Sequence, residues 1–216
     1  APSGTKDPFA QRRAALGLVQ NLITWQLSFD LKAGLQAAAA GLPIPASPES
    51  QAACLEFISG RLQSYLLDSG CRYDIVAAVL AEQGATPANA YRAVSELSLW
   101  AGHPHWNLIL PAYARCVRIT RDQPERFEIQ AEAISEPAEK ALLSALLNAE
   151  NTRRKPGSVD DFFSVFVPMI PAINQFFDQV LVMDEQETVR ANRLGLLQRI
   201  SALAGGVADF SRLEGF

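Results

Sequence analysis

The sequence predicts an all-α protein, a helical bundle made of two helical units. Three observations lead to this fold class. Apolar residues recur at helical spacing, capping and breaker residues cut the chain into helix-length segments, and alanine is frequent within them. Valine and isoleucine occur inside the same helical spacing, so no segment has the alternation that is typical of a strand.

Capping residues and glycines delimit the helices expected in the first half. The expected helices cover residues 9–27, 30–41, 47–70, 74–84 and 86–102. Their predicted N-terminal caps are Asp7, Asp30, Ser47, Asp74 and Thr86. Proline follows three of these caps, at the first helical position that it favours. Leu42-Pro43-Ile44-Pro45 should be extended, because two prolines forbid a continuing helix.

Longer connections separate the helices expected in the second half. These helices cover residues 104–120, 136–150, 158–182 and 184–204, followed by a closing turn at 207–213. Pro111 lies inside the first of them, and Pro168 and Pro171 interrupt the third. Residues 121–135 are charged and unpatterned, and 151–157 form a basic connection rich in breakers. The breakers around Gly102 predict two domains, 1–103 and 104–216.

Composition excludes several classes of protein. With 49% hydrophobic and 19% charged residues, the chain can fill a core and is not disordered. A net charge of −4 excludes nucleic-acid binding through bulk charge, but not through a local basic patch. No apolar run is long enough to span a membrane, so we expect no membrane partner and a cytoplasmic location. The start lacks both an initiator Met and a signal stretch, which suggests a piece of a longer chain.

Cysteine and histidine indicate neither a metal site nor a catalytic centre. Cys54, Cys71 and Cys116 are widely spaced in apolar stretches, which predicts three buried thiols in a reducing compartment. His103 and His105 flank a proline without a nearby Cys, Asp or Glu to complete a ligand set, so we expect them at a loop or helix start. Phosphate loops and hydrolase motifs are also absent from the sequence.

Arginines recur at helical spacing in the second half. An arginine recurs every three residues at Arg115, Arg118 and Arg121. The same spacing separates Arg190 from Arg193. Such spacing keeps side chains on one side of a helix. Guanidinium groups form forked bonds to phosphate and stack on bases, so the arginines as a set suit RNA binding. For any single arginine, a solvated or structural role is the simpler interpretation. The phenylalanines of the most apolar stretch are expected in the core: Phe162, Phe163, Phe166, Phe176 and Phe177.

Several segments, in order, resemble bacterial glycyl-tRNA synthetase β subunits. They are PSGTKDPF (2–9), RRAALG (12–17), RYD with AVL (72–80), EPAEKAL (136–142), FFDQVLVM (176–183), RANRL with LL (190–197) and VADFS (207–211). The family ends in a helical anticodon-binding domain of the DALR type. Here ETVR (187–190) replaces the naming motif, and Gly195 stands where alanine is common. By helix propensity alone, Gly195 weakens its helix by about 1 kcal/mol relative to alanine.

The resemblance implies a tRNA-binding and non-catalytic part of glycine–tRNA ligase. The parent enzyme uses ATP and Mg²⁺, and its α part, separate or fused, carries the class II catalytic site. No cofactor, catalytic residue or metal ligand is then expected in this chain. The expected partners are tRNA(Gly) and the α part. Residues 1–103 would be the end of an HD-like region, and 104–216 the anticodon-binding domain, with Arg115, Arg118, Arg190 and Arg193 as candidate tRNA contacts.

Two alternatives stay open at this point. The helices could form an interaction module that docks the α part or a second copy as a homodimer, with tRNA bound elsewhere. Residues 104–216 favour this alternative, because they hold 12 basic against 15 acidic residues. The chain could also be the terminal domain of an arginyl-tRNA synthetase, although the KDPF and RYD segments speak against it.

Overall fold

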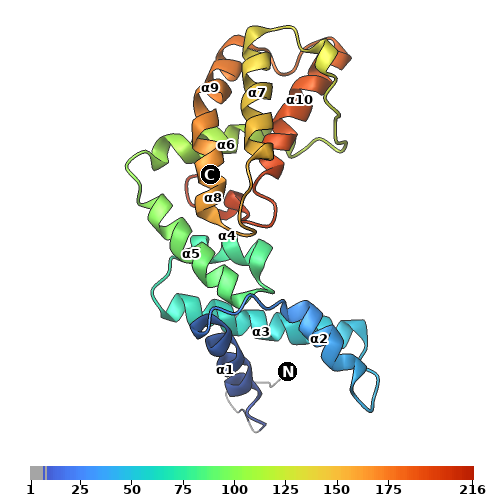
Figure 1. The fold of residues 1–216 in the computed structure, drawn as a ribbon, viewed down its shortest axis with the longest axis vertical. Coiled ribbons are helices and arrows are strands. Elements are labelled where there is room, and N and C mark those ends of the chain that lie inside the picture. Colours follow the sequence, from blue (N-terminus) through green and yellow to red (C-terminus); the bar gives the residue numbers. More distant parts are fainter. Residues whose placement is uncertain (1–6, 8) are drawn as a thin grey trace. The chain divides into compact units, whose positions relative to one another are not determined.

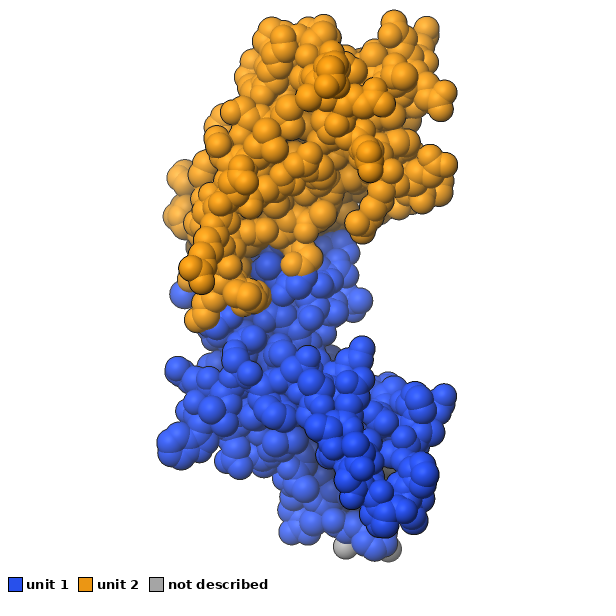
Figure 2. Space-filling view, turned by 45° about the vertical axis from the view of Figure 1, so that its right-hand side comes forward, with its two compact units in different colours: residues 1–99, 206–213 blue, residues 100–205, 214–216 orange. Residues whose placement is uncertain are grey.

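The computed structural model of the chain describes Asp7 and residues 9–216. Every regular element in this part of the chain is helical, which confirms the all-α prediction. The chain forms two compact units, residues 1–99 with 206–213 and residues 100–205 with 214–216 (Figure 2). A single cut after residue 103 does not describe this division, because residues 206–213 return to the first unit.

The first unit is organised around its longest helix. Its elements are α1 (Gln11–Thr24), α2 (Leu31–Ala40), α3 (Pro48–Asp68), α4 (Tyr73–Gln83), most of α5 (Pro87–Ala101) and η3 (Phe210–Arg212) (Figure 1). Helix α3 packs against α1, α2 and α4, and η3 packs against α4. The side-chain amide of Gln83 donates to the carbonyl of Val207 at 2.7 Å, which helps to hold the returning segment.

The second unit is a bundle with an aromatic core. Its elements are α6 (Trp106–Thr120), η1 (Ala131–Ala133), α7 (Pro137–Asn151), α8 (Val159–Phe166), η2 (Val167–Met169), α9 (Ile170–Gln179) and α10 (Glu187–Ala202). Helices α7, α9 and α10 run side by side in Figure 1, and α10 also packs on α6. Four of the five predicted core rings are fully buried, namely Phe162, Phe163, Phe166 and Phe176. Phe177 is only half-buried.

Side-chain caps define three of the helix starts. Asp30 accepts hydrogen bonds from the backbone N–H groups of Lys32 and Ala33, as predicted for the cap of α2. Ser47 and Ser158 cap α3 and α8 in the same way. Each of these side-chain oxygens satisfies an N–H group that the first helical turn cannot pair. The sequence is therefore sufficient to define these three starts.

Two predicted caps are placed differently. Helix α1 begins at Gln11 after Ala10, and the carboxylate of Asp7 accepts from the N–H groups of Arg12 and Arg13 at 3.3 and 3.4 Å. The predicted partner Pro8 lies outside the described residues. Asp74 does not precede α4 but lies in its first turn, only 1% exposed, where Arg72 binds its carboxylate at 2.7 Å.

The cysteine prediction is correct at one position only. Cys116 is buried, whereas Cys71 is half-buried and Cys54 is exposed on α3. Burial raises the pKa of the Cys116 thiol to about 12. Over Asp7 and residues 9–216, no group of three potential metal ligands is close enough to hold an ion. No helix in this range is both long and apolar enough to cross a bilayer.

Candidate nucleic-acid interface

Helix α6 presents two exposed arginines on one side. Arg115 and Arg118 are three residues apart near its C-terminal end, and both side chains are exposed. Arg115 lies over the ring of Phe177 on α9, with 4.2 Å between the guanidinium carbon and the ring centroid. Phe177 is half-buried, and this cation–π contact covers one face of its ring with a guanidinium.

Arg118 is supported in a similar way. Its guanidinium carbon lies 5.5 Å from the ring centroid of Phe216, which also contacts the ring of Tyr113. An arginine that rests on an aromatic ring has lost part of its rotational freedom before any ligand arrives. The outer face and the N–H fork of each guanidinium can then meet a base or a phosphate.

Arg193 lies in a different environment. It is 7% exposed, and its Nε donates to Glu139 at 2.6 Å while Nη1 donates to Asp184 and to the carbonyl of Leu181, each at 2.8 Å. Glu139 is also buried, and it accepts from the N–H groups of Ser135 and Glu136. This network ties α10 to the start of α7 and to the loop after α9.

Arg190 belongs to the same region as Arg193. It is half-buried, and its Nη1 donates to the carbonyl of Asp184 at 2.9 Å. The structure therefore does not bring the four predicted arginines to one exposed face. Arg115 and Arg118 have the expected exposure. Arg193 departs from the expectation of a surface residue, because two carboxylates and a carbonyl already bind its guanidinium.

The other basic side chains of the second unit divide between bound and exposed positions. Arg154 donates to the carbonyl of Leu203 at 2.8 Å, and Arg199 pairs with Glu150. The exposed guanidinium of Arg121 pairs with its exposed neighbour Asp122 at 3.7 Å. Such exposed pairs contribute little to stability, so Arg121 can turn to another anion.

The sequence pattern identified the arginines of α6 but missed the rings beneath them. One indication was available for Phe177. It directly follows Phe176 in α9, and successive helical residues are turned by about 100° from each other, so both rings cannot face the core centre equally. For Phe216 the sequence contains no comparable indication, because the contact depends on how the last residues fold back within the second unit.

Two family profiles match separate parts of the chain. The profile described as DALR anticodon binding domain matches residues 109–206, which include most of α6 and all of α10. The second unit is thus an anticodon-binding domain of the DALR class. The profile described as glycyl-tRNA synthetase beta subunit matches residues 1–81. The chain belongs to the glycyl-tRNA synthetase β-subunit family and corresponds to one region of such a subunit.

Similar proteins support the family over the whole chain. This chain is 33% identical over 217 residues to the glycine–tRNA ligase, chloroplastic/mitochondrial 2, of Arabidopsis thaliana. The aligned region covers 100% of this chain and 20% of the relative. The chain is 33% identical to the β subunit of Moorella thermoacetica and 30% to that of Lactococcus lactis subsp. cremoris, covering 98% and 99% of this chain. The chain spans 32% and 30% of these two relatives, so it corresponds to a third of their length or less.

Proposed function

We propose that this chain binds tRNA(Gly) through its DALR domain and recognises the anticodon for glycine–tRNA ligase. The observation that carries the proposal is the pair of exposed arginines on α6, each resting on an aromatic ring. Anticodon bases are unstacked, and proteins read such bases through stacking and hydrogen bonds. Arg115 and Arg118 can supply both, together with contacts to phosphate.

In this role the chain itself performs no chemical step. Activation of glycine with ATP and Mg²⁺ belongs to the α part, which is the second partner in the proposal. The second unit, residues 100–205 with 214–216, holds and orients the tRNA, and the first unit, as the end of an HD-like region, joins it to the remainder of the β subunit. Arg193 and Arg190 act indirectly, because they fix the loop between α9 and α10.

The experiment measures binding of a tRNA(Gly) transcript to the full chain at two salt concentrations. The double variant Arg115→Ala/Arg118→Ala should bind about 10- to 100-fold more weakly, since a stacking or phosphate contact is worth about 1–3 kcal/mol. It should also reduce the salt dependence, because fewer counterions are displaced. The control Arg13→Ala/Arg126→Ala removes the same charge from two other exposed positions.

The comparison of these two double variants decides the proposal. If the α6 double variant and the control double variant bind the transcript equally well, the loss of charge alone accounts for the change in affinity. The α6 pair then has no special role. A lysine pair at positions 115 and 118 separates stacking from charge. Lysine keeps the charge but lacks the planar fork, so it should restore the salt dependence and only part of the affinity.

An interaction module remains the second candidate function. Leu181 and Met183, in the loop after α9, are 69% and 50% exposed although Arg193 holds the backbone of this loop in place. A fixed loop with exposed apolar side chains suits a protein contact. In this case Leu181→Asp/Met183→Asp should abolish association with the α part or with a second copy in sedimentation velocity. The tRNA affinity would stay unchanged.

A further inference from the structure

A second group of aromatic rings lies away from the α6 arginines, at the turn between α5 and α6. Its members are Trp100, His103, His105 and Trp106, with the buried ring of Phe163 beneath them. Neighbouring ring centroids are 4.8 to 5.6 Å apart. Both histidines are exposed, and both tryptophans are half-buried. We call this group the aromatic patch.

Hydrogen bonds hold the rings of the aromatic patch in place. The indole N–H of Trp100 donates to Asp160 at 2.8 Å. The backbone N–H of His105 donates to Nδ1 of His103 at 3.2 Å. Because Nδ1 accepts this bond, the proton of the neutral imidazole lies on Nε2. His103 thus offers a ligand both an exposed ring face and an N–H donor.

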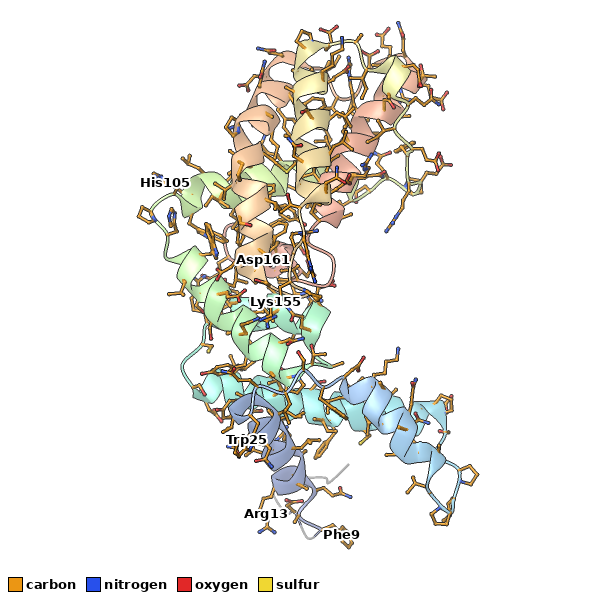
Figure 3. All side chains as sticks on the ribbon, in the orientation of Figure 1. Phe9, Arg13, Trp25, His105, Lys155 and Asp161 are labelled. Atoms are coloured by element: carbon orange, nitrogen blue, oxygen red, sulfur yellow. The ribbon has the colours of Figure 1, made fainter. Side chains whose placement is uncertain are left out.

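The basic segment 153–155 lies next to the first turn of α8, which contains Asp160 and Asp161. The backbone N–H of Lys155 donates to Asp161. Asp161 follows Asp160, the residue of α8 that accepts the indole N–H of Trp100. Figure 3 shows Lys155 and Asp161 next to each other, both in the second unit, with His105 at the α5–α6 turn. Arg153 and Lys155 are exposed, whereas Arg154 fixes the segment through its bond to the carbonyl of Leu203.

We propose that the aromatic patch, with Arg153 and Lys155, is a second RNA-binding site that takes an unpaired nucleotide. The base stacks on the imidazole of His103 or of His105, whose rings are tilted by 53° to each other, and the basic side chains meet phosphates further along the same strand. Aromatic platforms beside cationic side chains are the usual means of holding single-stranded nucleic acid. The acidic neighbours Asp160 and Asp161 each already accept a hydrogen bond, from the indole of Trp100 and from the backbone N–H of Lys155.

This second site rests on the proposed function in one respect, namely that its ligand is RNA. It differs in location, since it uses none of the α6 arginines. It also differs in the expected selectivity. Stacking accepts any base because every base has a π-face, so this site adds affinity for an unpaired segment without reading its sequence.

The chain contains only two histidines, which permits a direct test by proton NMR. The full chain is titrated with a seven-nucleotide unpaired RNA and, in parallel, with intact tRNA(Gly) transcript. Stacking should shift the imidazole C2–H resonances of His103 and His105 upfield through the ring current of the base. The variant His103→Phe assigns the two resonances. Inorganic polyphosphate of similar charge serves as the control probe, because it has no bases and should leave both resonances almost unmoved.

Affinity provides the second measurement. His103→Ala/His105→Ala should weaken binding of the seven-nucleotide RNA about tenfold, and His103→Phe/His105→Phe should restore most of it. Tyr91→Ala, which removes an exposed ring from α5 in the first unit, should have no effect. Far-UV circular dichroism checks that each variant keeps its helices.

The outcomes separate this site from the α6 site. Histidine resonances that stay in place at saturating RNA and tRNA would overturn the proposal, as would an equal response to polyphosphate. Arg115→Ala/Arg118→Ala should weaken tRNA binding but leave the histidine shifts at saturation intact. If the histidines shift while the α6 variant binds normally, the proposed anticodon contacts fail and the aromatic patch stands. A patch that captures the α part instead, without any RNA response, would be a protein interface.

Discussion

Replacing Gly195 by alanine should destabilise the protein, although alanine is the better helix former. Gly195 lies in the middle of α10, where alanine is favoured by about 1 kcal/mol over glycine. A Cβ atom at this position, however, would lie 2.8 Å from the carbonyl oxygen of Phe127 and 3.3 Å from Cγ1 of Ile129. The loop before η1 thus packs directly on the glycine.

Side-chain hydrogen bonds prevent this loop from moving away easily. Gln198 accepts from the N–H of Phe127 at 3.0 Å and donates to the carbonyl of Glu125 at 2.8 Å. Asn192 accepts from the N–H of Gln130 at 2.6 Å and donates to its carbonyl at 2.8 Å. A shift of the loop by a few tenths of an ångström would therefore strain four bonds to α10.

The expected magnitude follows from two opposing contributions. Overpacking a fixed site costs about 1–3 kcal/mol, and the better helix propensity returns about 1 kcal/mol. Gly195→Ala should therefore lower the free energy of unfolding by about 1 kcal/mol, measured by urea denaturation with far-UV circular dichroism. The matched control is Gly60→Ala in α3, where nothing lies within 4 Å of the new Cβ, and it should gain up to about 1 kcal/mol.

Opposite signs for the two glycines are the essential outcome. If Gly195→Ala raises the urea midpoint as Gly60→Ala does, the loop yields to the methyl group and the close approach has no energetic consequence. A crystal structure of the variant would then show the carbonyl of Phe127 displaced from α10.

Three further predictions concern titratable and ionic groups. Arg193→Met should lower the free energy of unfolding by about 3 kcal/mol in the same assay, because it leaves a buried carboxylate without its cation. Burial holds the pKa of Cys116 at about 12, so at about pH 8 a maleimide should label Cys54 rapidly and leave Cys116 unlabelled, as mass spectrometry would show. The N–H of Gln186, and then Arg193, lower the pKa of Asp184. Asp184→Asn should therefore reduce stability at neutral pH, and the difference from the unchanged chain should vanish as pH falls from the ordinary aspartate value of about 3.9 through the lowered one.

The candidate site shows which properties of a side chain helical spacing can predict and which it cannot. Spacing alone placed Arg115 and Arg118 on one side of a helix, and the structure shows them exposed. The same spacing joined Arg190 to Arg193, but Arg193 is buried between two carboxylates. Spacing defines which side chains share a face of a helix. It does not define whether solvent or another helix covers that face, since this depends on partners far apart in the chain.

The amino-acid sequence by itself determined the fold class, most helix starts and the family. These properties depend on interactions within a few residues, such as the caps made by Asp30 and Ser47, or on ordered motifs along the chain. Only the tertiary structure decided the close approach of the Phe127 carbonyl to Gly195, the burial of Arg193 and the packing of Trp100 and Trp106 on Phe163. Each of these depends on a contact between residues distant in sequence, and local propensity contains no information about such contacts.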